Sequence, residues 1–529
     1  MKKNHAKEMM MSGIGFGLIN EDLVHNILAR LPAPSFASAA CVSKSWNSIC
    51  NRILSRPKLS SALSLNPSFA VAVNEVLEKV LSEPIRPHFA IANVGNGFGS
   101  GLHESLQLIT QKLGSKTPVI VSTVEGILGR DALTDEFKEV KWESPFIDES
   151  YAPEKSCINE GIILTVGFLP GLKIEAIPLL QPAEASRVAA IDNFVTDIRE
   201  FSASVSGCSF PVGIVMFGGA LSNMKAILEK LDYAMPMDTV IVGDERGCFR
   251  YRSGNDSRNA CGKREYPKEA VALVFARDKD KPCGVGEIQF HVAMSNGVLP
   301  VGTRHKAVSV RTCRSECSTW LTARREGQQE ILDGQNILDH INDELENHIE
   351  SPDLYIGVTK RRKCSIGSQR PRLQKFFAFH GVEGGDEEYL YVDGVGIKTG
   401  DSFQFYLSDP KIALSSCADV SVQFKNFNLD KNSKVGRGVS DIAVKDVFGG
   451  LIFSCCGRGE SFFGRPNVDS SPFLENFPGV PVGGVFCSGE IARFSSNLIG
   501  QGQEESSFRC FVHVYSSVYL VMSYTPVEF

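Results

Sequence analysis

The chain has 529 residues, of which 43% are hydrophobic and 22% are charged, and its formal net charge is −6. A length this great exceeds what one hydrophobic core usually serves, so several domains are expected. The mildly acidic charge disfavours nucleic acid and anionic membrane as partners, and no stretch approaches the roughly 20 apolar residues of a membrane helix.

The first recognisable element is a short helix near the N-terminus, after a predicted disordered tail at residues 1–16. Asn20 is a good N-cap, and Glu21 and Asp22 follow it where the helix dipole favours negative charge. Pro32 should end the helix. Apolar residues recur at helical spacing between these limits: Leu23, Val24, Ile27, Leu28 and Leu31.

Two more short helices are expected before residue 62. Ser35 can cap the second helix, and Trp46, Ile49, Cys50 and Ile53 share one face of the third. Three helices of this size bury too small a core to be very stable alone, so part of their apolar surface should be covered by something else.

Residues 17–62 resemble an F-box, because a leucine-rich first helix and a Leu-Pro break precede the Cys41–Trp46 segment, CVSKSW. The family has a proline in the first turn, where this chain has Asn20. The resemblance implies docking to the Skp-type adaptor of a cullin–RING ubiquitin ligase. The alternative is a helical hairpin whose apolar residues form only a core. The implied adaptor contacts are Leu23, Ile27, Leu28, Leu31, Pro32, Val42 and Trp46.

From about residue 86 the pattern changes to α/β, and one unit occurs three times. An apolar strand, a glycine-bearing loop with a helix, and a second apolar strand span residues 88–122, 213–242 and 450–486. The three copies predict parallel strand pairs and suggest duplication. An amphipathic helix is expected over 327–349. Further strands are expected at 158–169, 270–275, 286–294, 389–395, 402–407, 420–424 and 509–524.

Residues 86–525 resemble the FIST domain, an α/β module seen beside F-boxes. The matching segments are Val119–Gly129, Ser295–Gly302, Ile397–Asp401, Phe453–Gly459 and Gly484–Glu490. The resemblance implies a three-helix F-box, a linker at 63–85, and a duplicated mixed-sheet α/β module with domains at 86–280 and 281–529. It also implies a non-catalytic receptor that recruits a target protein for ubiquitination. The alternative is a sensor of a small ligand, a metabolite or amino acid, which could also gate recruitment.

A candidate ligand or target contact lies in the third α/β unit. Its two parallel strands should end at one edge of the sheet, where ligands commonly bind. Arg458 could pair with Glu490 to tie the two loops together, or it could serve a ligand and lower the pKa of Cys455. The candidate residues are Cys455, Gly457, Arg458, Gly459, Ser488, Gly489 and Glu490.

Other motifs carry weaker signals. The loop Gly95–Gly101, with Glu125 beyond it, partly matches a dinucleotide fingerprint, and a flexible turn explains it as well. The basic run Lys360–Lys363 predicts either a nuclear localisation signal or a solvated loop between Tyr355 and Phe376. No catalytic motif, zinc-ligand spacing or leucine-rich repeat is found, so no cofactor or metal is expected. The 15 scattered cysteines favour the cytoplasm or nucleus.

Overall fold

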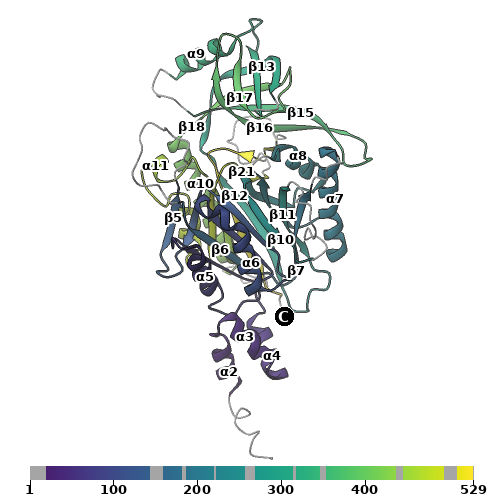
Figure 1. The fold of residues 1–529 in the computed structure, drawn as a ribbon, viewed down its shortest axis with the longest axis vertical. Coiled ribbons are helices and arrows are strands. Elements are labelled where there is room, and N and C mark those ends of the chain that lie inside the picture. Colours follow the sequence, from purple (N-terminus) through teal and green to yellow (C-terminus); the bar gives the residue numbers. More distant parts are fainter. Residues whose placement is uncertain are drawn as a thin grey trace, which may run out of the picture.

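The computed structural model describes residues 20–142, 159–180, 186–219, 222–255, 268–313, 317–345, 353–435, 445–493, 509–510 and 512–527. The predicted tail, residues 1–16, lies outside this range. A small group of helices stands at one end of the molecule, an α/β body occupies the middle, and an antiparallel sheet forms the opposite end (Figure 1). The predicted fold class, N-terminal helices followed by mixed α/β structure, is confirmed.

The N-terminal module contains helices α2 (Glu21–Leu28), α3 (Ala33–Ala40) and α4 (Lys44–Ile53). Its core is small and is built mainly from Val24, Leu28, Phe36, Ile49 and Cys50. The predicted cap at Ser35 is wrong, because α3 already begins at Ala33 with Pro32 as its N-cap. Proline suits this place, since it needs no backbone N–H there and its φ is compatible with a helix start.

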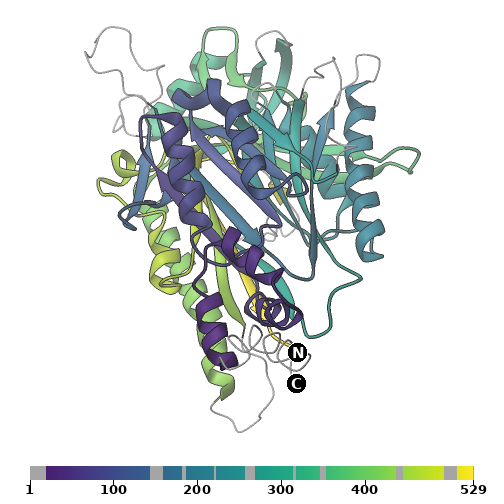
Figure 2. The same cartoon turned by 60° about the horizontal axis from the view of Figure 1, so that its bottom comes forward.

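The first sheet begins before the predicted α/β boundary. Its strand order is β1 (Lys58–Ser64), β6 (Ile162–Phe168), β2 (Phe89–Gly95), β3 (Val119–Val124) and β10 (Phe249–Arg252). Helices α5 (Phe69–Val80) and α6 (Leu102–Leu113) cover one face of this sheet (Figure 2). Every residue of β2 is buried, as expected of a strand covered on both faces.

The predicted linker at 63–85 is therefore wrong, and so is an F-box that extends to residue 62. Strand β1 pairs with β6 over seven residues, and α5 buries an apolar face against the sheet. The buried residues of α5 recur at helical spacing: Ala72, Val73, Val76, Leu77 and Val80. The body of the protein starts near residue 58.

The three predicted parallel pairs are all present. Strand β2 pairs with β3, β8 (Gly213–Gly219) with β9 (Val240–Gly247), and β19 (Asp446–Cys455) with β20 (Val482–Cys487). Helix α6 connects the first pair and α8 (Met224–Ala234) the second. The third connection contains two short helices, α11 (Glu460–Phe463) and α12 (Ser471–Asn476).

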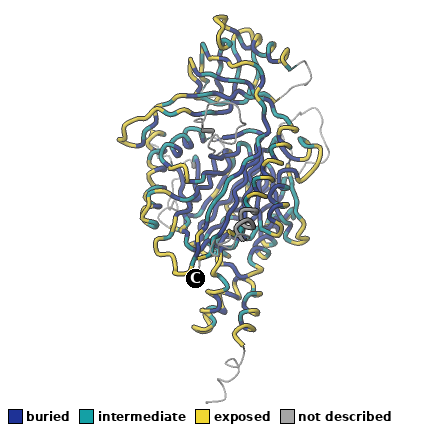
Figure 3. The backbone as a smooth tube through the Cα atoms, turned by 180° about the vertical axis from the view of Figure 1, so that it is seen from behind, coloured by how far each residue is buried: buried dark blue, intermediate teal, exposed yellow. Residues whose placement is uncertain are grey.

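Two further sheets, each with six strands, combine segments from both halves of the chain. The predicted domain boundary at residue 280 is therefore not a clean boundary. One sheet has the order β23 (Val512–His513), β21 (Glu490–Ala492), β9, β8, β11 (Lys268–Arg277) and β7 (Leu172–Leu180), with α7 (Arg187–Ser206) packed on it. The other has the order β12 (Glu287–Ser295), β24 (Ser517–Thr525), β19, β20, β4 (Gly126–Arg130) and β5 (Phe137–Lys141). The buried backbone concentrates in these central strands (Figure 3).

The fourth sheet closes on itself as a barrel. Its order is β15 (Leu354–Cys364), β18 (Ser402–Ser408), β13 (Val298–Cys313), β14 (Ser318–Arg325), β17 (Leu390–Asp393) and β16 (Arg372–Gly385), and β15 also pairs with β16. The short strand β22 (Arg509–Cys510) adds to β16. Helix α9 (Gly334–Glu344) contributes Ile337 and Ile341 to the barrel core.

Two predicted segments have a different structure. Residues 420–424, predicted as a strand, lie in α10 (Pro410–Val435), where Val420 and Phe424 are buried one helical turn apart. Residues 355–376, predicted as a solvated loop, form most of the β15–β16 hairpin. The helix predicted over 327–349 is shorter, since α9 ends at Glu344, and its predicted last residue, Ile349, lies outside the described residues.

Candidate functional site

The N-terminal helices expose an apolar stripe. Asn20 caps α2 as predicted, with its Oδ1 accepting a hydrogen bond from the Asp22 N–H at 3.0 Å. On this helix Leu23 and Ile27 are 53% and 50% exposed. Val42, just before α4, is 65% exposed. When a partner covers large apolar side chains this exposed, their burial stabilises the complex.

The other predicted adaptor contacts differ in accessibility. Pro32 is exposed, and Leu31 and Trp46 are half-buried. Leu28 is completely buried in the core of the module, so its prediction as an adaptor contact is wrong. Helical periodicity explains this result, because Val24 and Leu28 lie on the inward face of α2, which α4 covers.

The helical module is fixed to the body. The Ala33 N–H donates a hydrogen bond to the Leu81 carbonyl at 2.8 Å, at the end of α5. Ala33 also belongs to the core between α5 and the first sheet. Leu54 packs against that core and against the core of the helical module. The apolar stripe is therefore held in a defined direction relative to the body.

A second candidate region lies where β19 and β20 end. Cys455 and Cys487 are paired in the parallel register, so the two predicted loops begin side by side. The parts of these loops differ in burial. Cys456, Gly457, Ser488 and Gly489 are half-buried, whereas Cys455, Arg458, Gly459 and Glu490 are buried.

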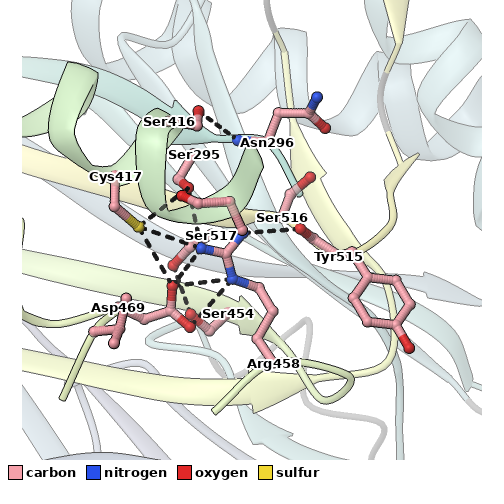
Figure 4. Close-up of polar contacts among 12 residues, drawn as sticks. Ser295, Asn296, Ser416, Cys417, Ser454, Arg458, Asp469, Tyr515, Ser516 and Ser517 are labelled. Atoms are coloured by element: carbon pink, nitrogen blue, oxygen red, sulfur yellow. Dashed lines mark hydrogen bonds and ion pairs between the residues drawn. The ribbon is translucent and has the colours of Figure 1, made fainter. Parts of the chain in front are cut away.

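Arg458 pairs with Asp469, and the predicted pairing with Glu490 is wrong. Its Nη2 lies 2.7 Å from Asp469 Oδ1, and its Nε lies 3.2 Å from Oδ2 (Figure 4). Nη1 donates to the Tyr515 carbonyl at 2.8 Å, and Nη2 donates to Ser295 Oγ at 3.0 Å. Burial alone would lower the pKa of Arg458, but the Asp469 carboxylate raises it above its usual value. The guanidinium stays charged and is enclosed by protein on every side.

The thiol best suited to reaction is Cys456, which the sequence analysis did not single out. The predicted activation of Cys455 is wrong, because its contact with Cys456 and its burial raise its pKa well above the usual value. The hydrogen bond from Cys455 lowers the pKa of Cys456 to about 7, against the effect of burial. Ser488 Oγ lies 3.7 Å from the Cys456 sulfur. A substantial fraction of the Cys456 side chain can therefore be the reactive thiolate near neutral pH.

Two buried carboxyl groups face the same strand ends. Asp244 and Glu490 are cross-strand partners in the β9–β21 pair, and burial raises the pKa of each well above its usual value. Glu490 accepts a hydrogen bond from the Ser516 N–H at 3.2 Å. Asp244 Oδ2 has no hydrogen-bond partner in the described part of the chain. The sequence analysis did not single out Asp244, because its cross-strand neighbour Glu490 is 246 residues away in the sequence.

The glycine-rich loop after β2 serves the fold. The N–H groups of Gly95 and Gly97 donate to the carbonyls of Gly161 and Asn159 at 3.0 and 2.9 Å. A Cβ at Gly95 would lie 2.2 Å from the Asn159 carbonyl oxygen. The chain's own backbone thus occupies the close approach that a dinucleotide phosphate would need. Within the described ranges, no group of His, Cys, Asp and Glu residues is arranged to hold a metal ion.

Comparison with known proteins identifies the N-terminal module. The F-box domain family matches residues 18–57. An Arabidopsis thaliana protein named as an F-box/LRR-repeat protein is 46% identical over 531 residues, which covers 99% of this chain and 97% of the relative. The chain belongs to the F-box protein family. F-box proteins are typically non-catalytic subunits that connect substrates to an SCF-type ubiquitin ligase through a Skp-type adaptor.

The F-box therefore comprises α2, α3 and α4, and its family match ends where β1 is about to begin. An uncharacterised protein of Mycobacterium tuberculosis is 27% identical over 148 residues, which is 28% of this chain and 33% of that protein. The Arabidopsis relative's name refers to leucine-rich repeats. In this F-box protein the described strands instead form four sheets of five to seven strands. None of its described helices combines the length and apolar character needed to cross a membrane.

Proposed function

We propose that this F-box protein is the substrate-recognition subunit of a cullin–RING ubiquitin ligase. Its F-box binds the Skp-type adaptor, and its FIST-like body recruits a target protein for ubiquitination. The observation that carries the proposal is the exposed stripe of Leu23, Ile27 and Val42 on the module that matches the F-box family. The exposed Pro32 and the half-buried Leu31 and Trp46 complete the proposed adaptor surface.

The attachment of the F-box to the body suits this role. A ligase subunit must hold its target at a defined position relative to the adaptor. The hydrogen bond from Ala33 to Leu81 and the shared packing of Leu54 fix the F-box against α5 and the first sheet. In Figure 1 the three F-box helices stand clear of the body at one end, so an adaptor can reach their outer surface.

Co-purification with a recombinant Skp-type adaptor tests the proposal. Ile27→Asp combined with Val42→Asp places two charges on the exposed stripe and should weaken adaptor binding at least thirtyfold, about 2 kcal/mol. Leu133→Asp combined with Val188→Asp is the matched control, because these apolar residues of the body are also more than half exposed. The control should bind like the wild type. Equal adaptor binding by both double variants would refute the proposed adaptor surface.

A small-ligand sensor is the second candidate function, and the strand ends beside Cys456 favour it. Cys456, Ser488 and Gly489 are half-buried there, close to Asp244 Oδ2, which has no hydrogen-bond partner among the described residues. We expect that metabolite and amino-acid screening would find a ligand that raises the melting temperature by mass action. Asp244→Asn should abolish that shift, whereas a ligand whose shift survives the substitution binds elsewhere.

A further inference from the structure

The outer half of the β15–β16 hairpin is strongly basic. Between residues 357 and 381 the chain has seven Lys and Arg residues and no Asp or Glu. Figure 1 shows the hairpin reaching from the barrel over α8 and α7. Residues 360–375 of this hairpin, with the turn that joins the two strands, are here called the basic arm.

The inner face of the basic arm is anchored to the body. Cys364, Ile366 and the adjoining Phe376 are buried in the core formed with α7 and α8. Lys230 on α8 donates to the Ser365 carbonyl, and the Gly367 N–H donates to Asp192 Oδ2 at 3.1 Å. The arm is thus pre-organised, and a partner would not have to order it on binding.

Two cations of the basic arm already interact with other residues of the protein. Lys360 is buried, and its Nζ lies 3.0 Å from His380 Nε2, while burial lowers its pKa to about 7. Arg362 pairs with Asp401 at 2.7 Å. The run Lys360–Lys363 therefore presents only Arg361 and Lys363 at the surface.

The outer face of the arm carries exposed cations on both strands. Arg361 lies opposite Lys375, and Lys363 lies opposite Leu373, which is 65% exposed. Arg370 and Arg372 are exposed at the turn. Within the described ranges, no ion pair involves Arg361, Lys363, Arg370 or Arg372. Like charges placed opposite each other destabilise a strand pair, so the charge of Arg361 does not stabilise the pairing of β15 with β16.

We infer that the outer face of the basic arm binds an acidic segment of the target protein. Carboxylate or phosphate groups of the segment would pair with Arg361, Lys363 and Lys375, and an apolar side chain would cover Leu373. Arginine suits such partners, because its planar fork binds both oxygens of an anion. This inference rests on the proposed function, since it names the surface that receives the target.

A protein segment fits this face better than nucleic acid does. The arm belongs to a chain whose net charge is −6, so an extended polyanion would also meet acidic surface. The exposed Leu373 lies between Lys363 and the cations of the turn, where an amphipathic peptide can bury it. A phosphate backbone has no apolar group for that position.

Fluorescence anisotropy of the full chain tests the inference with two labelled probes, a Glu-rich peptide containing one Leu and its phosphoserine counterpart. The triple variant Arg361→Glu, Lys363→Glu, Lys375→Glu should bind at least about tenfold more weakly than the wild type. The control variant Lys112→Glu, Lys411→Glu, Lys425→Glu has the same net charge and changes exposed lysines elsewhere. It should bind like the wild type, with the same salt dependence. Tighter binding of the phosphoserine probe would identify phosphate as the preferred anion.

Four results separate the outcomes. Equal binding by the two triple variants would overturn the inference, and so would tighter binding of a duplex DNA than of either peptide. Leu373→Ser should weaken binding of the Glu-rich peptide severalfold and leave binding of DNA unchanged. Adaptor co-purification is run on the same proteins, where the arm variant should behave like the wild type. Failure of the wild type to bind adaptor would refute the proposed ligase role and leave the peptide result standing.

Discussion

Arg458 and Asp469 form a fully buried ion pair that joins the loop after β19 to the segment before α12. The guanidinium also contacts Ser295 at the end of β12 and the Tyr515 carbonyl before β24. Nη2 also donates to Cys417 Sγ of α10 at 3.3 Å, so one side chain connects five segments of the body. Because each guanidinium nitrogen has a hydrogen-bond partner, the desolvation cost of the pair is offset by short hydrogen bonds.

Removing one member of this pair should destabilise the body strongly. Asp469→Asn leaves the buried Arg458 charge without its counter-ion, and we expect a loss of about 3–5 kcal/mol in the free energy of unfolding. Arg52→Ala is the control, because it breaks an ion pair with Glu21 in which both side chains are more than half exposed. That change should cost at most about 1 kcal/mol. Urea unfolding measures both values. Equal losses would show that the buried ion pair contributes no more to stability than the exposed one.

The starting point of the body can be tested with two fragments. A fragment of residues 57–529 retains β1 and α5 and should fold with cooperative unfolding. A fragment of residues 86–529 exposes the edge of β6 and the apolar surface that α5 covers. We expect it to aggregate or to bind a hydrophobic dye. If both fragments melt alike, residues 58–85 are not part of the body.

Cys456 should be the first of the two adjacent thiols to react with iodoacetamide. Its pKa of about 7 predicts a labelling rate that rises between about pH 6 and 8, while Cys455 should stay unlabelled in the folded protein. Fragment-ion mass spectrometry distinguishes the two positions, and Cys283, an exposed thiol, is the internal reference. Ser488→Ala removes one hydrogen bond to Cys456 and should shift the rise to higher pH. Faster labelling of Cys455 would contradict this assignment.

Acid should destabilise the barrel through His305. Burial lowers the pKa of this residue to about 4, and its ring stacks on Phe403 at 5.4 Å. The unfolded chain binds the proton near pH 6.5, so the contribution of His305 to stability is complete above pH 6.5 and is lost as the pH falls towards 4. His305→Phe should remove up to about 3 kcal/mol of this loss.

The comparison of wild type with His305→Phe isolates the histidine. Burial also raises the pKa of Glu139, to about 7, and that carboxyl acts in the opposite direction because its contribution is lost as the pH rises from 4.5 to 7. Such effects are common to both proteins and cancel in the difference between their melting temperatures. An equal decline of both proteins between pH 6.5 and 4.5 would contradict the role of His305.

The sequence by itself determined the elements whose partners lie close along the chain. Asn20 caps α2 with its own side chain, and each parallel pair lies within about 40 residues, together with the helix that connects its strands. Helical spacing likewise predicted the apolar residues of α2, but it did not show which of them face outwards, since Ile27 is exposed and Leu28 is buried. Caps and periodicity depend on neighbouring residues, which is why they can be recognised without the fold.

Only the tertiary structure decided which distant segments meet. Val420 and Phe424 suit a strand by residue type, yet α10 buries both beside β19 and β24. The basic run Lys360–Lys363 has the composition of a solvated loop, but pairing with residues 372–376 makes it a strand. The buried Arg458 requires a carboxylate as its ion-pair partner, and by sequence position either Asp469 or Glu490 could have filled that role. Asp469 became its partner because its carboxylate lies in line with the guanidinium donors inside a buried site, a geometry set by packing between elements far apart in the chain.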